Sequence, residues 1–516
     1  MSEQQIGGQQ EKGTNWVAVI TMMFIYGMIS FVTNLAAPMG NVWKYQPGID
    51  GSNMWGMMGN MMNFLAYLFM GIPAGRMLTK CGYKKTALIA IATGLVGVAV
   101  QFVSGKVGIC SDCGSFSLVG GKPFSFYIYL LGAFICGFAV CMLNMVVNPM
   151  LNLLGGGGNR GNQLNMIGTT FNSMCGTATP ILVGALIGEI TKATKVADVN
   201  LVMYIAMAVF AAALVILSMI PIKDPEQGKT TEVIPVLAPL KFRHCLLGVI
   251  GIFMYVGIEI GIPATMNNWL ADKDNSPLKT LKDDKQAPLY VTQKDWVGEE
   301  KVCTTCKTHY KDYTAERDAA DKAKQAVCAA MELAKKEGRP FKEPLGTAAV
   351  AGMVAGTYWF LMLIGRTIGA FIGGKVSSRV LMTFTTGTAI ALIAIGAFIP
   401  ATTTTSMPVF TGKGFVMATV PLTALLFALC GLMTSIMWPS TFNLATEKLG
   451  KYTAAASGLF MVMVVGGGVL PLVQNGIADS CGYMISYIIP GAALAYLFIY
   501  SAFLSKPPAD IDEQVK

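Results

Sequence analysis

The sequence predicts an all-α membrane protein with twelve transmembrane helices in two six-helix halves. Its 516 residues are 53% hydrophobic and only 13% charged, whereas soluble proteins carry about 25% charged residues. The mean hydropathy is +0.54. Runs of about 20 apolar residues, the length that crosses a bilayer core, recur along the whole chain. A polar stretch divides these runs six and six, and the two halves resemble each other.

The apolar runs place the predicted spans at residues 15–39, 53–78, 84–104, 125–153, 163–190, 200–220, 245–270, 349–374, 378–400, 414–445, 452–478 and 483–504. The start, MSEQQIGGQQEKGTNW, is polar and has no basic n-region, so we expect no cleaved signal peptide. Lys and Arg cluster in the loops after spans 2, 6 and 8. By the positive-inside rule, both termini are predicted to be cytoplasmic. The formal charge of +9 therefore reflects topology, and we expect no nucleic-acid partner.

An internal repeat supports the division into halves. FNSMCGTATPILVGALIGE in span 5 has the same order of Gly cluster, Pro, Gly and acid as MVVGGGVLPLVQNGIAD in span 11. The predicted units are an N-terminal bundle at 1–221, a cytoplasmic linker at 222–244 and a C-terminal bundle at 245–516. Repeated halves are typical of transporters whose substrate site lies at mid-membrane between them.

A polar insertion at 271–343 interrupts the second half between spans 7 and 8, on the predicted outer side. Its segment YTAERDAADKAKQAVCAAMELAKKEG contains strong helix formers and ends in Gly, so it predicts a helix. Long insertions are usually functional or disordered. A lid over the entrance and an inert decoration both remain open.

Two Cys-x-x-Cys pairs lie on the predicted outer side, one before span 4 and one in the insertion. Cysteines in an oxidising compartment form disulfides, but paired Cys-x-x-Cys motifs are also the spacing of zinc sites. The sequence favours disulfides, because four spans separate the two loops and His309 is the only histidine nearby. The pairing stays open; the candidates are Cys110, Cys113, Cys303, Cys306 and Cys328.

Two charged residues lie deep within apolar spans. Glu259 is in span 7 and Arg366 is in span 8. A charge at the centre of a membrane helix costs at least about 2.5–3.5 kcal/mol. Each should therefore face a wet cavity or pair with an opposite charge. The two could form a structural ion pair or act directly in an ion-coupled transport pathway.

Amides inside the spans form the larger polar set. Asn144 and Asn148 are one helical turn apart and project from the same face. Single amides can serve only as interhelical hydrogen bonds, but their recurrence predicts a polar central cavity. Amides that donate and accept, beside aromatic rings, suit a neutral polyhydroxylated ligand. The substrate-binding candidates are Asn34, Asn144, Asn148, Asn172, Asn268, Trp438 and Gln474.

The sequence does not predict an enzyme. It has no G-x-x-x-x-G-K-[ST] motif for nucleotide hydrolysis, and only two histidines. We expect no cofactor and no metal.

GIPAGRMLTKCGYKK resembles the major facilitator signature between spans 2 and 3, with Thr79 in place of the usual acid. YVGIEIG, NPMLNLLG, QLNMIGTTFNS, WFLMLIGRTIGA and residues 435–479 resemble the fucose/galactose/glucose permease branch of that superfamily. The resemblance implies the major facilitator fold, alternating access, and ion-driven monosaccharide uptake across a bacterial inner membrane by a monomer. The signature suggests Gly75 and Arg76 as gating residues, and Pro149 and Pro439 are candidate bends.

The sequence departs from the proton-coupled members of that family at two positions. These members carry acids where this chain has Asn34 and Asn144, and an amide cannot carry a proton at physiological pH. Coupling could then use a proton on Glu259, Na⁺ held by Glu259 with amide oxygens, or no ion at all. A carrier of another neutral solute such as a nucleoside, an exporter and a transport-dead sensor remain alternatives.

Overall fold

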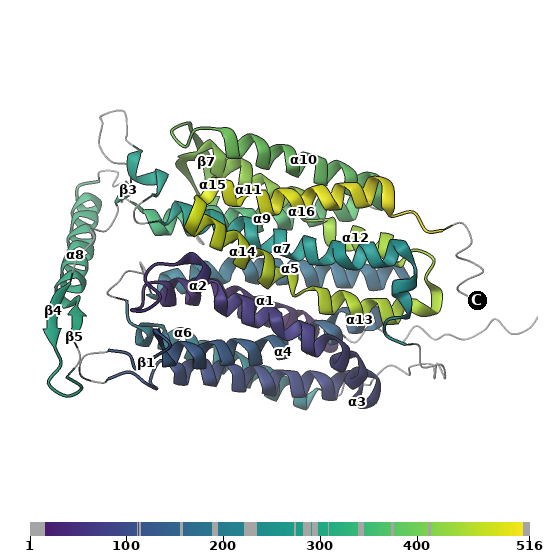
Figure 1. Ribbon diagram of the computed structural model, residues 1–516, viewed down its shortest axis with the longest axis horizontal. Helices are drawn as coiled ribbons and strands as arrows, with labels where there is room; N and C mark the ends of the chain where they lie inside the picture. The colour runs from purple at the N-terminus through teal and green to yellow at the C-terminus, as the bar shows by residue number, and fades with distance from the viewer. Residues whose placement is uncertain are drawn as a thin grey trace, which may run out of the picture.

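The computed structural model describes residues 16–508 except 111, 113–114, 155–157, 188–193, 221–234, 273–274, 282–289, 292–297, 308, 339–344, 373–375 and 411–413. It is a bundle of long, roughly parallel and antiparallel helices (Figure 1). Within the described part of the chain, ten helices are long and apolar enough to cross a membrane. The predicted helical membrane fold is thus confirmed. The described parts of the predicted spans at 53–78 and 163–190 lie almost entirely in α2, α3 and α5, but these segments are not among those ten.

The helices and strands of the N-terminal half are α1 (Trp16–Lys44), α2 (Asn53–Gly56), α3 (Met58–Ser104), β1 (Leu118–Val119), β2 (Lys122–Pro123), α4 (Phe124–Leu154), α5 (Gly158–Ile187) and α6 (Asn200–Met219). Element α3 contains two helices that meet at Gly82, whose φ is 80° and ψ is 173°. Glycine adopts this conformation at little steric cost, so the chain turns there between predicted spans 2 and 3.

The helices and strands of the C-terminal half, outside the insertion, are α7 (Arg243–Leu270), α9 (Thr347–Ile372), α10 (Ser378–Phe398), β7 (Thr404–Phe410), β8 (Phe415–Pro421), α11 (Leu422–Thr434), α12 (Met437–Thr446), α13 (Thr453–Met463), α14 (Gly466–Cys481), α15 (Tyr483–Ser486) and α16 (Ile488–Ile499). The predicted start of span 10 at 414 is wrong, because residues 415–421 pair with 404–410 as an antiparallel hairpin. The β-branched residues of FVMATVP favour a strand, and the helix begins only after Pro421.

The insertion contains a helix and short strands: β3 (Tyr290–Val291), β4 (Glu299–Val302), β5 (His309–Asp312), α8 (Thr314–Lys336) and β6 (Leu345–Gly346). The predicted helix is present as α8, and Gly338 follows it with a φ of +65°. Strands β4 and β5 form an antiparallel hairpin. The insertion lies across one end of the bundle, here called the insertion end (Figure 1).

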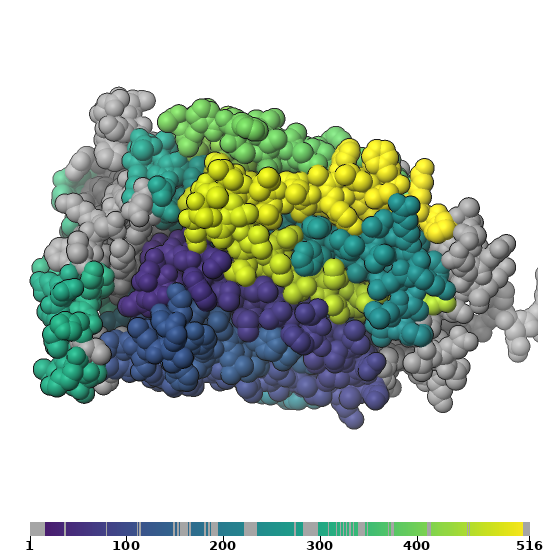
Figure 2. Space-filling view, viewed as in Figure 1, coloured from purple at the N-terminus to yellow at the C-terminus, as the bar shows by residue number. Residues whose placement is uncertain are grey.

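The two halves lie side by side along the bundle, as Figure 2 shows in purple and blue for the first and mostly green and yellow for the second. Helix α5 packs against α9, and α3 packs against α13 and α14. Glycine permits a close approach here: a Cβ added at Gly468 would lie 3.0 Å from the Met61 Cα atom on α3. Small residues allow membrane helices to pack closely, so Gly468 lets the halves meet.

Candidate functional site

A partly buried ion pair lies near the middle of the bundle. The Arg366 Nη2 atom of α9 donates to the Glu259 Oε1 atom of α7 at 3.1 Å. The side chains are 22% and 15% exposed. Two charges that are scarce in this chain's membrane helices therefore satisfy each other, as the sequence indicated. We call Glu259 and Arg366 the central pair.

Arg366 also reaches the other half of the protein. Its Nη1 atom donates to the Ser173 hydroxyl of α5 at 2.7 Å and lies 3.5 Å from the Thr169 carbonyl oxygen. The guanidinium has donors arranged in a planar fork, so one side chain can hold both partners. The central pair thus connects α7 and α9 of the C-terminal half to α5 of the N-terminal half.

Aromatic groups lie on the Glu259 face of α7, and a buried amide lies against a different face of the same helix. Tyr255 is one helical turn before Glu259 and is buried, and its ring centroid is 6.0 Å from that of Trp438 on α12. Gln474 of α14 is buried close to Gly261, two residues after Glu259. The Gln474 Nε2 atom has no hydrogen-bond partner in the described residues. A buried donor without a partner costs free energy, which a bound polar ligand or water would recover.

The amide candidates of the N-terminal half each make contacts there. Asn144 Nδ2 donates to the Tyr67 hydroxyl at 2.8 Å, and Asn172 Nδ2 donates to the Tyr26 carbonyl oxygen at 3.0 Å. Asn34 Nδ2 donates within α1 to the Ser30 carbonyl oxygen at 2.9 Å. The side chain of each amide also contains a carbonyl oxygen, which is a hydrogen-bond acceptor. These amides are half-buried, so they are suitable for a ligand that brings its own donors.

Asn268 lies farther along α7 than Glu259 and contacts Asn475 of α14. Its Nδ2 atom donates to the Asn475 Oδ1 atom of α14 at 2.9 Å, and Asn475 donates in turn to the Thr265 hydroxyl. Asn268 is nine residues beyond Glu259, or about 13 Å along the helix. The structure therefore does not bring Asn268 together with the central pair.

The gating candidates are spread over the bundle. Arg76 and Pro439 are exposed, and Gly75 is half-buried near the Met145 side chain. The side chains of Asn148 and Pro149 lie outside the described residues.

A cluster at the insertion end was missed by sequence reasoning. Asp479 of α14 accepts four hydrogen bonds from the start of α2: from the Ser52 hydroxyl, the Asn53 amide side chain and the backbone N–H groups of Asn53 and Met54, at 2.7–3.1 Å. Tyr483 accepts from Asn53 at 3.0 Å and donates to Asp272 at 2.6 Å. We call Ser52, Asn53, Asp479, Tyr483 and Asp272 the end cluster. Its signal was the acid that closes the repeated motif of span 11.

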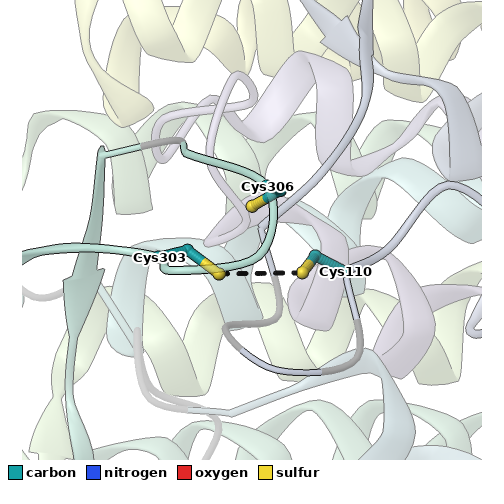
Figure 3. Close-up of side chains that lie close together, drawn as sticks. All are labelled: Cys110, Cys303 and Cys306. Atoms are coloured by element: carbon teal, nitrogen blue, oxygen red, sulfur yellow. Dashed lines mark hydrogen bonds between the residues drawn. The ribbon is translucent and has the colours of Figure 1, made fainter.

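The cysteine candidates fall into two groups. Cys110, Cys303 and Cys306 converge, with their sulfur atoms all within 4.8 Å of one another (Figure 3). None of these three is bonded to another, and neither is Cys328, which is exposed on α8. Cys113 lies outside the described residues. The disulfide assignment stays a prediction.

Comparison with known proteins gives relatives over the full chain. No family model matches the sequence. The chain is 22% identical over 511 residues to the glucose/galactose transporter of Brucella abortus, covering 97% of each chain. It is 24% identical over 510 residues to the putative glucose/galactose transporter of Helicobacter pylori, covering 95% of this chain and 97% of that protein.

A solved structure shares the fold. The fucose:proton symporter FucP of E. coli superposes with a TM-score of 0.59 at 16% identity, over 96% of this chain and 100% of FucP. Similarity at that level of identity supports the helical arrangement alone. Together, these comparisons show that the chain is similar over its full length to glucose/galactose transporters and shares the fold of a fucose:proton symporter.

Proposed function

We propose that the protein is a secondary transporter, not an enzyme, that imports a monosaccharide by alternating access and is coupled to H⁺. Its full-length relatives are glucose/galactose transporters, and the structure that shares its fold is a fucose:proton symporter. The observation that carries the proposal is the central pair, because it joins three helices of both halves near mid-bundle. The two halves must move apart and together in alternating access.

The sugar site of this proposal lies beside the central pair. Asn144 and Asn172 supply half-buried amide groups, and Gln474 supplies an unpartnered donor beside another face of α7. Trp438 and Tyr255 supply flat apolar ring faces. Hydroxyl groups of a sugar donate and accept, and its C–H faces stack on rings. A neutral hexose or deoxyhexose fits this set better than an anion does. An anion would need several cations, and Arg366 is the one cation among the described residues near the site.

Glu259 is the proposed proton carrier. When Glu259 is ionised, it holds Arg366 by charge; when it is protonated, that attraction is lost, while Arg366 keeps its bond to Ser173. Proton binding would then loosen α9 from α7 while Arg366 keeps its bond to α5. A ligand needs a differential interaction of this kind in order to shift a conformational equilibrium.

The finer architecture belongs to the same proposal. We infer twelve transmembrane helices in the bacterial inner membrane, two six-helix units at 1–221 and 245–516, cytoplasmic termini, an external insertion and a monomeric carrier. The ten helices described above, with the helical segments in α3 and α5, support the count of twelve.

Uptake by proteoliposomes tests the proposal. Labelled glucose, galactose and fucose are offered with a pH gradient and a Na⁺ gradient imposed separately, for wild type and Glu259→Gln. We expect accumulation of at least one sugar with an inward pH gradient, and loss of accumulation in Glu259→Gln with sugar exchange retained. The sugar assignment is wrong if no sugar enters under any gradient. Dependence on Na⁺ alone would replace H⁺ by Na⁺, and equal uptake without a gradient would indicate a uniporter.

A further inference from the structure

Three thiols from two distant parts of the chain meet at the insertion end. Cys110 belongs to the loop between α3 and α4, whereas Cys303 and Cys306 belong to the insertion. The sulfur atoms of Cys110 and Cys303 are 3.9 Å apart, and all three lie within 4.8 Å of one another (Figure 3). Nothing in the transport mechanism uses these groups.

Local structure directs the thiols toward one another. Cys303 and Cys306 lie at the tip of the β4–β5 hairpin, where the Lys307 N–H donates to the Cys303 carbonyl oxygen at 3.0 Å. Lys307 has a φ of +57°, which turns the chain back into β5. Across from this turn, the Cys110 N–H donates to the Ser115 carbonyl oxygen at 2.9 Å. Each thiol-bearing loop is thus held by its own backbone.

We propose that Cys110, Cys303 and Cys306 bind a Zn²⁺ ion as thiolates. A tetrahedral zinc with Zn–S bonds of about 2.3 Å separates its sulfur ligands by about 3.8 Å, and the Cys110–Cys303 separation is close to this. A disulfide would use two of the three described thiols, whereas a metal ion can bind all three. Zinc binding releases the thiol protons and needs no oxidant.

The surroundings also suit a structural metal. Cys303 is only 4% exposed. The Ser115 hydroxyl lies 3.4 Å from the Cys306 sulfur, and the Thr305 hydroxyl donates to Asp112 across the two loops. Hydrogen bonds of this kind orient metal ligands. Cys113 is three positions after Cys110 in the sequence and outside the described residues, so the assignment rests on the three described thiols.

The site would attach the insertion to the opposite half of the protein. The insertion leaves the bundle between α7 and α9 of the C-terminal half, but Cys110 belongs to the N-terminal half. Arg317 on α8 also forms a surface ion pair with Asp198 of the N-terminal half, at 3.6 Å. This contact links the insertion to the same half as Cys110. Zinc would make this attachment firm, since structural zinc sites contribute directly to folding.

Metal analysis of the full-length protein, purified in detergent without chelator, tests the proposal. We expect about one zinc per chain by mass spectrometry, released by a mercurial thiol reagent, and loss of that zinc in Cys303→Ser. Cys328→Ser and Cys481→Ser, which change exposed cysteines outside the cluster, should keep it. Zinc that persists in Cys303→Ser is adventitious and overturns the proposal, as does a zinc-free protein.

A second measurement on the wild type does not depend on how a variant folds. After zinc is exchanged for Co²⁺, we expect the thiolate-to-cobalt absorption band and the visible bands of a tetrahedral site. Peptide mapping without reductant should show Cys110, Cys303 and Cys306 as free thiols once metal is removed. A disulfide between any two of them would overturn the zinc assignment and support the alternative read from the sequence.

Discussion

The central pair and the end cluster both join the two halves of the protein, but they do so with different chemistry. In the centre, the Glu259 carboxylate pairs with the Arg366 guanidinium, and Arg366 also donates a hydrogen bond to the Ser173 hydroxyl of α5. At the insertion end, the exposed Asp479 is held by a hydroxyl, an amide and two backbone N–H groups, without a cation in contact with it among the described groups.

A proton can change the central pair, whereas we expect the end cluster not to depend on a coupling ion. Protonation of Glu259 removes half of a charge pair in a poorly hydrated site, where charges interact strongly. Asp479 is exposed, so water competes for its hydrogen bonds and each is easily replaced. We therefore expect the centre to determine coupling and the end cluster to determine how readily the halves separate there.

Removal of the central cation should have the largest effect. Breaking one partner of a buried ion pair costs about 3–5 kcal/mol, so we expect Arg366→Ala to lower sugar uptake about 100-fold. Arg366→Lys keeps the charge but loses the forked geometry and should recover only part of it. Arg243→Ala, at an exposed arginine at the start of α7, serves as the control. Normal uptake by Arg366→Ala would remove the central pair from the mechanism.

A second acid in the centre should have the next largest effect. Asn144→Glu would place a carboxyl beside the Tyr67 hydroxyl, where an unpaired charge is costly. We expect uptake at neutral pH to fall on the order of tenfold and to recover as the pH is lowered and the acid is neutralised. Asn144→Gln, which adds no charge, is the matched control. An unchanged pH profile in Asn144→Glu would place residue 144 outside the coupling path.

Weakening the end cluster should have a smaller effect on a different property. Asp479→Asn removes the charge that strengthens four hydrogen bonds, and we expect the halves to separate at that end about fivefold more often, since each such bond is worth about 1 kcal/mol or more. Labelling of Ala478→Cys by a maleimide, in a Cys481→Ser background, reports the separation. Asp318→Asn, at an exposed acid on α8, is the control. Equal labelling rates would show that the end cluster does not hold the halves together.

The insertion should show the smallest effect, and only at low pH. Hydrogen bonds from Lys301 and Thr314 hold the pKa of Asp312 below its usual range. A lowered folded-state pKa stabilises the hairpin at pH values above the unfolded pKa of about 3.9, and that stabilisation is lost as the pH falls toward the folded value. The protection factors for hydrogen exchange in β4 and β5, which correct for the intrinsic rate at each pH, should therefore fall below about pH 4 in wild type. Asp312→Asn should abolish this pH dependence and Asp321→Asn should not; the same fall in Asp312→Asn would assign it to another group.

Much of the fold could be predicted because membrane helices are apolar and long. The segments at 53–78 and 163–190 gave weaker signals, since polar and glycine residues that serve packing lower their hydropathy. Residues 414–421 were wrongly assigned to a helix because apolar runs alone cannot distinguish a strand from a helix start.

The candidate site was predictable only where a residue is costly to bury. Glu259 and Arg366 stood out for that reason, and their pairing is present in the structure. Ser173 could not be found, because a hydroxyl in a membrane helix usually bonds its own backbone. Asn268 was grouped with the others, although its depth and its partner Asn475 set it apart.

The insertion bridges the two halves of the protein. It begins and ends in the C-terminal half, yet it contacts the N-terminal half through Arg317 and Asp198. The insertion therefore acts as a tether that favours contact between the halves at this end. A tether raises the effective concentration of its partners, to the order of millimolar for short linkers. When alternating access opens this end, we expect the contact to form again within the same molecule. The dwell time of the open state is thus a property of the insertion as well as of the transport site.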